Sequence, residues 1–149
     1  MPLKFNIYAN PVIAPSFYWA KVVDLRAEQV DDGRPRLHIR LQIGPMHEAA
    51  AGLTLASIIH PTEAARFYFV NFVNAYRIAG PNYEQAIGRW ASVQVSPAKY
   101  QGAEYSAVKY THQPLLIRTK SIILERAEAL GRLDQETLGQ VMIEQFGCD

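Results

Sequence analysis

The sharpest pattern in the chain is a strict alternation of apolar and polar side chains over residues 36–43. The apolar positions share one face and are Leu37, Ile39, Leu41 and Ile43. The polar positions share the other face and are Arg36, His38, Arg40 and Gln42. A period of two over this length predicts a half-buried β-strand with one face in water.

A looser alternation precedes this strand at residues 16–27 and places Phe17, Trp19, Val23 and Leu25 on one predicted face. The cluster Asp-Asp-Gly-Arg-Pro at 31–35 separates the two segments and is typical of a turn, so the pair is expected to form a hairpin. A third strand is expected at 53–59, after a loop that contains Gly44, Pro45 and Gly52.

A helix is predicted next, because Thr62 is a good N-cap and apolar side chains then recur at spacings of three and four. Gly80 and Pro81 are expected to end it. Alternating residues from Trp90 to Tyr110 predict a second hairpin, with its turn at Gln101 and Gly102.

Beyond Pro114 the pattern becomes helical, with an apolar stripe that ends before Gly131. Asp134 is the expected N-cap of a second helix. The stripe of the first helix comprises Leu116, Ile123, Ala127 and Leu130, and that of the second comprises Leu138, Val141, Met142 and Phe146.

This element order predicts a mainly β chain with helices, of the α+β class. Five strands with a helix between the third and fourth are the order of a five-stranded OB-fold-like barrel, here followed by a C-terminal helical pair. A ferredoxin-like sandwich would need a helix after the first strand, and the turn at 31–35 is too short for one. We therefore expect a barrel domain at 1–112 and a two-helix appendage at 113–149.

Composition narrows the class of protein. Apolar residues make up 49% of the chain, enough for a core, and no apolar run is long enough for a membrane span or a signal peptide. The single cysteine, Cys148, excludes an intramolecular disulfide, so a cytoplasmic location is expected. Residues 1–112 carry eleven Lys and Arg against eight Asp and Glu, and residues 113–149 carry four against six. A basic body with an acidic end is compatible with nucleic-acid binding.

Four segments of the body carry a resemblance to a protein family. They are Tyr-Trp-Ala-Lys-Val-Val-Asp at 18–24, Gly-Arg-Pro-Arg-Leu-His-Ile at 33–39, Gly-Arg-Trp-Ala-Ser-Val at 88–93 and the hairpin at 99–110. Over residues 16–112 the chain resembles small phage- and plasmid-borne OB-fold-like proteins associated with single-stranded DNA binding and recombination. The resemblance implies an OB-like barrel and a role with single-stranded DNA. Residues 119–147 resemble a helical pair in phage recombination accessory proteins, but the chain stops just after the second helix.

No catalytic, metal or cofactor constellation is recognisable, so no enzymatic activity is expected. The four histidines, His38, His47, His60 and His112, lack the spacing of a metal site, and Cys148 has no histidine near it in sequence. The pair Asp31–Asp32 precedes Gly33 and is typical of a turn. An enzyme with a noncontiguous site near His60 or His112 remains an alternative.

The residues favour a binding protein, with single-stranded DNA as the expected partner. Arg36, His38 and Arg40 share a strand face on which they could meet phosphates. Such binders add aromatic rings that stack on bases. The candidate rings are Tyr18, Trp90, Tyr105 and Tyr110, and the further candidate phosphate contacts are Lys21, Arg89, Lys99 and Lys109. Two alternatives stay open: these side chains only solvate or fill the barrel, or the protein is an interaction module that forms oligomers through its C-terminal helices.

Overall fold

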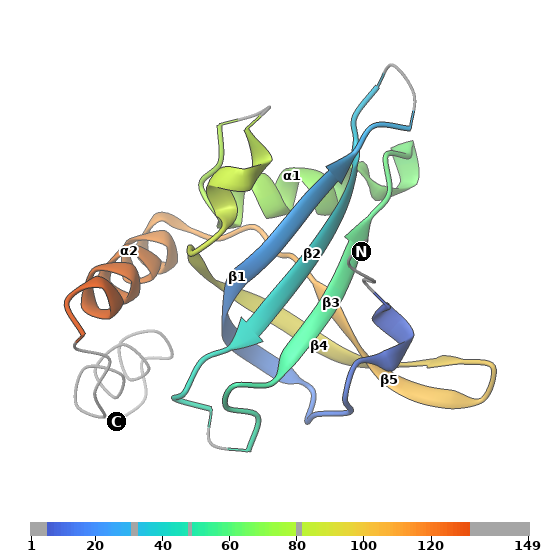
Figure 1. Ribbon diagram of the computed structural model, residues 1–149, viewed down its shortest axis with the longest axis horizontal. Helices are drawn as coiled ribbons and strands as arrows, with labels where there is room; N and C mark the ends of the chain where they lie inside the picture. The colour runs from blue at the N-terminus through green and yellow to red at the C-terminus, as the bar shows by residue number, and fades with distance from the viewer. Residues whose placement is uncertain (1–5, 31–32, 48, 80–81, 132–149) are drawn as a thin grey trace.

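The structure is a computed structural model that describes residues 6–30, 33–47, 49–79 and 82–131. Five strands form one sheet, and two α-helices accompany it (Figure 1). The strands are β1 (Ser16–Glu28), β2 (Arg36–Ile43), β3 (Thr54–Ile59), β4 (Trp90–Tyr100) and β5 (Ala103–Lys109). The helices are α1 (Arg66–Ala75) and α2 (Leu115–Ala129), and single 3-10 turns are η1 (Ile7–Ala9), η2 (Glu63–Ala65) and η3 (Tyr83–Ala86).

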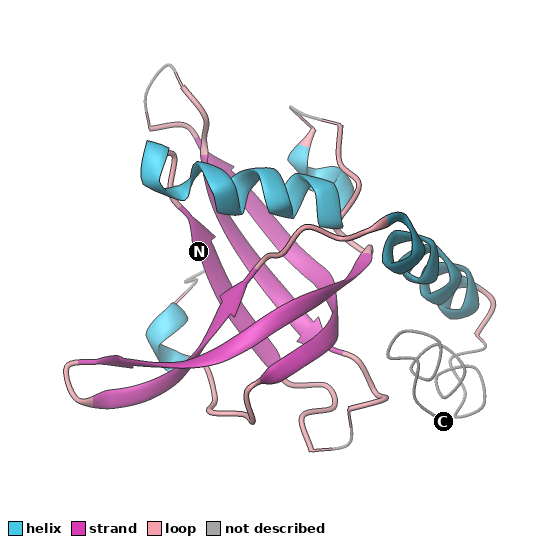
Figure 2. Ribbon diagram, turned by 180° about the vertical axis from the view of Figure 1, so that it is seen from behind, coloured by secondary structure: helices cyan, strands magenta, loops and turns pink. Residues whose placement is uncertain are grey.

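The sheet is antiparallel throughout, with the order β3-β2-β1-β4-β5. The long strand β1 curls it, because the first part of β1 pairs with β4 and the later part pairs with β2. A β-bulge between Val22 and Asp24 increases the local twist. The result is a half-barrel whose concave side is crossed by α1 (Figure 2).

The alternation in β2 is confirmed, since its four apolar side chains lie in the core and its four polar side chains are half-buried on the convex face. The prediction that Phe17, Trp19, Val23 and Leu25 share one face of β1 is wrong. Trp19 lies on the side of α2, Leu25 lies in the main core, and Phe17 is 42% exposed. The bulge explains the difference, because an extra residue at Val23 reverses the facing of all later side chains.

Helix α1 begins close to the predicted position but ends earlier. Thr62 Oγ1 accepts a hydrogen bond from the N–H of Ala65, as an N-cap does, and the short turn η2 leads into α1. The end is a Schellman motif: the N–H of Ile78 donates to the carbonyl of Val73, and that of Arg77 to Asn74. Arg77 takes the left-handed conformation (φ 56°) in which glycine is usual, so the helix stops before Gly80 is reached.

The predicted hairpin of β4 and β5 is confirmed, with Gln101 and Gly102 at its turn. Both residues have positive φ, 51° and 81°, which is the type I′ conformation that matches the twist of paired strands.

Helix α2 packs against the outside of the half-barrel through Leu124, which lies with Trp19 and Trp90 in a second small core. Two glutamates of α2 also hold it in place. Glu128 forms an ion pair with Lys21 and accepts a hydrogen bond from the Trp90 indole N–H. Glu125 forms an ion pair with Arg77 and accepts a hydrogen bond from the backbone N–H of Trp90. Of the predicted stripe of α2, Ala127 is buried, whereas Leu116, Ile123 and Leu130 are exposed.

The fold class is therefore α+β, with a curled, barrel-like antiparallel sheet and two helices. The helices differ in placement from the predicted barrel with a terminal pair: α2 lies alone beside β1 and β4 in the described residues (Figure 1). The second predicted helix, from Asp134, lies outside those residues. No described helix has the length and apolar run that crossing a bilayer requires.

Candidate functional site

The curl of the sheet brings its two edge strands, β3 and β5, close together. At one point the buried side chain of Asn10 joins them. Its Nδ2 donates to the carbonyl oxygens of Ala56 and Ser106, both at 2.9 Å, and its Oδ1 accepts from the N–H of Ala56 at 2.7 Å. We call the line where residues 56–60 face residues 106–110 the seam. Among the described strands the seam is joined by side chains rather than by a backbone ladder.

A second side-chain bridge crosses the seam from within the core. The Tyr110 hydroxyl donates to Ser57 Oγ at 2.9 Å, and both residues are buried. Burial raises the pKa of this hydroxyl well above its usual value, so it stays protonated and keeps its role as donor.

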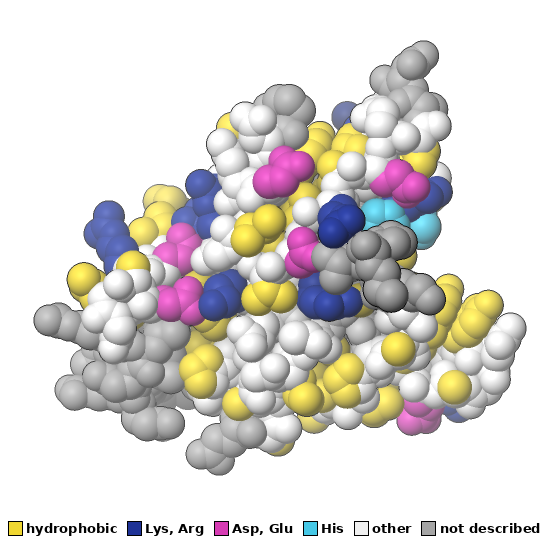
Figure 3. All heavy atoms as spheres, in the orientation of Figure 1, with side chains coloured by type: hydrophobic (Ala, Val, Ile, Leu, Met, Phe, Trp, Pro, Cys, Tyr) yellow, Lys and Arg dark blue, Asp and Glu magenta, His cyan; other side chains and the backbone are white. Residues whose placement is uncertain are grey.

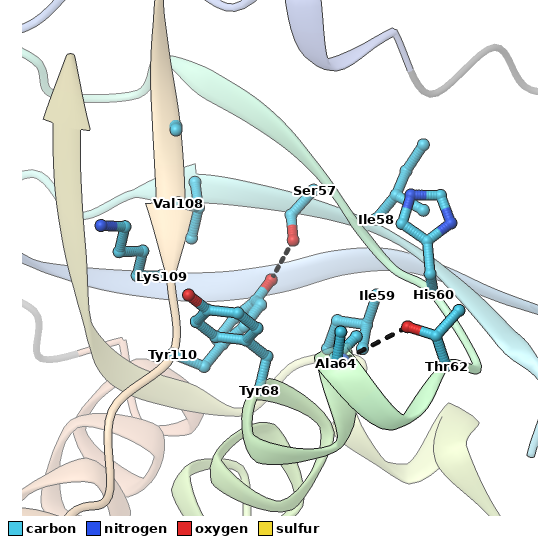
Figure 4. Close-up of a pocket in the computed structure, with 12 residues that line it drawn as sticks. Ser57, Ile58, Ile59, His60, Thr62, Ala64, Tyr68, Val108, Lys109 and Tyr110 are labelled. Carbon is cyan, nitrogen blue, oxygen red and sulfur yellow. Dashed lines mark hydrogen bonds between the residues drawn. The ribbon is translucent and has the colours of Figure 1, made fainter. Parts of the chain in front are cut away.

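Beyond the Asn10 bridge the seam opens into a pocket of about 490 Å³ (Figure 4). Its walls are mostly apolar and include Ile58, Ala65 and Val108. Tyr68 of α1 lies at the mouth with 41% of its surface exposed, and the exposed Lys109 lies on the rim. The volume is within the range of pockets that hold small molecules.

The predicted basic strip of β2 borders this pocket, because His38 is in register with Ile58 of the pocket wall. Its charges are partly compensated. Glu28 Oε1 lies 2.9 Å from Arg36 and 3.1 Å from His38. Hydrogen bonds from His38, and then from Arg36, hold the pKa of the Glu28 carboxyl below its usual value.

Arg40, the third member of the strip, is half-buried and in register with Asp24 across the sheet. Figure 3 shows the resulting convex face, on which basic and acidic side chains are interspersed. The strip is therefore a mixed-charge surface rather than a uniformly basic one.

Three of the four predicted stacking rings are buried: Tyr18 at 8% exposure, and Trp90 and Tyr110 at 2% each. Tyr18 and Tyr110 fill the main core on the inward side of the curled sheet, and Trp90 fills the small core between the sheet and α2. A base could stack on none of them in this structure.

Tyr105, the fourth ring, is half-buried on the hairpin of β4 and β5. It meets the edge of Tyr8 at a centroid distance of 5.3 Å, and Tyr8 stacks on Tyr100 at 3.9 Å. Lys99 is exposed on the same hairpin, in register with Glu104.

Lys21 and Arg89, two of the predicted phosphate contacts, have structural partners. Lys21 Nζ lies 2.7 Å from Glu128 and 5.6 Å from the centre of the Trp90 ring. Arg89 donates to the carbonyl oxygens of Tyr76 and Arg77. Both cations hold α1, α2 and the sheet together, and a phosphate would have to displace those contacts.

Four residues at the seam and hairpin were not among the predicted site residues: Tyr8, Asn10, Tyr68 and Tyr100. Tyr68 has a local signal, since the segment Phe-Tyr-Phe-Val at 67–70 has too many large side chains for one buried helix face. Asn10 has none, because its partners are 46 and 96 residues away in sequence.

One titratable group outside the seam, His47, has a structural role. The N–H of Trp19 donates to His47 Nε2 at 2.8 Å, which requires an unprotonated nitrogen. Burial lowers the pKa of His47 to about 4. In the described part of the chain, no three His, Cys, Asp or Glu side chains gather as a metal site would require. Cys148 and the pair Asp31–Asp32 lie outside that part.

Neither a protein-family model nor a curated protein sequence matches the chain.

Proposed function

We propose that this protein is a non-enzymatic accessory protein that binds single-stranded DNA on an OB-fold-like barrel. The binding surface would extend over the convex faces of β2, β3 and β5. The OB-fold part of the proposal is supported by the strand order, by the helix between β3 and β4, and by the approach of the two edge strands at the seam.

One observation carries the proposal: an apolar pocket with an exposed aromatic ring and an exposed lysine opens beside the basic strip of β2. Single-strand binders combine cations that follow the phosphates with rings and apolar surface that receive the bases. Here Arg36, His38 and Arg40 stand on one side of the pocket and Lys109 on the other.

The mixed charge of the strip predicts how binding depends on salt. Arg36 has to give up part of its contact with Glu28 to bind a phosphate. Its net contribution to the free energy of DNA binding is therefore small. Lys109 is exposed and on the rim, so its loss should reduce the salt slope by about one unit.

The test is a fluorescence anisotropy titration with labelled oligo(dT) at several salt concentrations. We expect Lys109→Ala and Arg40→Ala to weaken binding and to reduce the salt slope. The matched control is Arg126→Ala, which removes an exposed cation from α2. Binding no tighter than millimolar at low salt, or equal losses in the control, would refute the proposal.

A second candidate function, an interaction module that forms oligomers, rests on the outward face of α2. Leu115, Leu116, Ile122, Ile123 and Leu130 are each at least 37% exposed and recur at a spacing of seven. Faces of this kind pack against other helices. Light scattering of the full chain against Leu116→Lys and Ile123→Lys variants tests it, and a monomeric mass in all three samples would exclude self-association through this face.

A further inference from the structure

Asn10 indicates which chemical group fits between the two strands of the seam. Its planar carboxamide donates to two backbone carbonyls and accepts from one backbone N–H. These bonds are 2.7–2.9 Å long, as in a well-formed ladder. An amide in the plane of the sheet is therefore the group that these edges recognise at residues 56 and 106.

The next position along the seam offers the same kind of edge. Backbone polar groups of a strand alternate in direction with a period of two. Since Ala56 and Ser106 turn theirs toward the seam, Ile58 and Val108 do the same two residues later. Both residues line the pocket. The pocket thus offers the backbone polar groups of two strand edges to a planar ligand that carries an amide along its own edge.

The faces of such a planar group would meet apolar and aromatic surface. Figure 4 shows the Tyr68 side chain, which comes from α1, among the groups that line the pocket together with Tyr110 and the side chains of β3. Lys109 stands on the rim, outside the apolar walls, where a phosphate linked to the planar group could reach it.

The geometry at Asn10 argues against an extended peptide as the occupant. One nitrogen atom lies 2.9 Å from both Ala56 O and Ser106 O, so these oxygens are at most about 6 Å apart. The Asn10 side chain already fills this gap and uses the polar groups of both edges there. A peptide strand could not continue past the bridge, whereas a compact ligand would end there.

We infer that the seam pocket binds one unstacked nucleobase that carries a ring amide, namely thymine, uracil or guanine. Its amide edge meets the backbone of Ile58 and Val108, its face stacks on Tyr68, and its phosphate meets Lys109. Adenine has no ring carbonyl and is not accepted. This inference rests on the proposed function and adds to it a base preference and a position for the base.

The first experiment compares oligo(dT) with the same oligonucleotide built from N3-methylthymidine, which keeps charge and stacking but lacks the ring N–H. We expect about tenfold weaker binding of the methylated strand, the effect of losing a hydrogen bond to a buried partner. Tyr68→Ala should weaken oligo(dT) binding by about tenfold, and Tyr68→Phe should preserve it. Phe67→Ala is the control, because Phe67 is an exposed ring on the same helix that does not line the pocket.

The second experiment titrates thymidine monophosphate, adenosine monophosphate and N-acetylvaline methylamide into the labelled protein and records amide shifts by NMR. Shifts of Ile58 and Val108 with the thymidine nucleotide alone support the inference. Equal shifts with the adenosine nucleotide, or shifts with the peptide analogue alone, overturn it.

The two proposals can fail separately. If oligo(dT) binds with the expected salt slope but Tyr68→Ala and N3-methylation change affinity less than twofold, the base pocket is wrong and the DNA-binding surface stands. If the nucleotide shifts the pocket amides but no oligonucleotide binds, the pocket stands and the DNA-binding proposal fails.

Discussion

Replacing Asn10 with alanine tests how much of the stability of the fold depends on the Asn10 bridge across the seam. The substitution removes three hydrogen bonds, to Ala56 O, Ser106 O and the N–H of Ala56, at a position with 7% exposure. Each contributes about 1 kcal/mol net, and the backbone groups left behind are partly shielded from water. We expect the free energy of unfolding to fall by about 3 kcal/mol, a large share of the roughly 5–15 kcal/mol of a small domain.

Urea unfolding measures this loss, with fluorescence of the buried Trp19 and Trp90 as the signal. An m-value of about 2 kcal/mol per molar converts the loss into a midpoint lower by about 1.5 M. Asn6→Ala is the matched control, because Asn6 makes one exposed hydrogen bond, to the N–H of Tyr8. A loss below about 1 kcal/mol for Asn10→Ala, or one no larger than that of the control, would show that the seam does not depend on the bridge.

Three further predictions concern stability, each measured by urea unfolding. The folded-state pKa of His47, about 4, lies below the usual 6.5, so stability is present above pH 6.5 and is lost as the pH falls through 4. Because His47 is partly exposed, we expect a loss of only about 1–2 kcal/mol, and a smaller one in His47→Gln. Gly102→Ala, at φ 81°, should cost about 1–2 kcal/mol, whereas Ala103→Gly should cost less than about 1 kcal/mol; equal losses would contradict the type I′ turn. Tyr110→Phe should cost about 1 kcal/mol through its lost bond to Ser57, and no further loss is expected when Ser57→Ala is added.

The parts of the fold that the sequence predicts are those fixed by neighbouring residues. The alternation in β2, the cap at Thr62 and the turn at Gln101 and Gly102 each depend on a few consecutive positions. The prediction of which β1 side chains face the core was wrong, because a single bulge reverses the direction of the side chains that follow it. No local sequence pattern marks this bulge.

The candidate site was harder to predict because it depends on contacts between distant segments. Alternation alone cannot separate a ring that fills a core from one that faces solvent, as Trp90 and Tyr110 show. Lys21 is a basic residue whose partner, Glu128, comes from a helix 107 residues later. Only the curl of the sheet decides which edges meet, and therefore where the pocket lies.

The position of Asn10 also has a consequence for synthesis of the chain. Strands β1, β2 and β3 leave the ribosome and can pair early, but the partner of Asn10 on β5, Ser106, lies 96 residues later. Until β5 emerges, the edge of β3 has no neighbour and carries the apolar residues Leu55, Ile58 and Ile59. The nascent chain is therefore most open to wrong pairing between the synthesis of β3 and that of β5, and the arrival of β5 also completes the wall of the pocket.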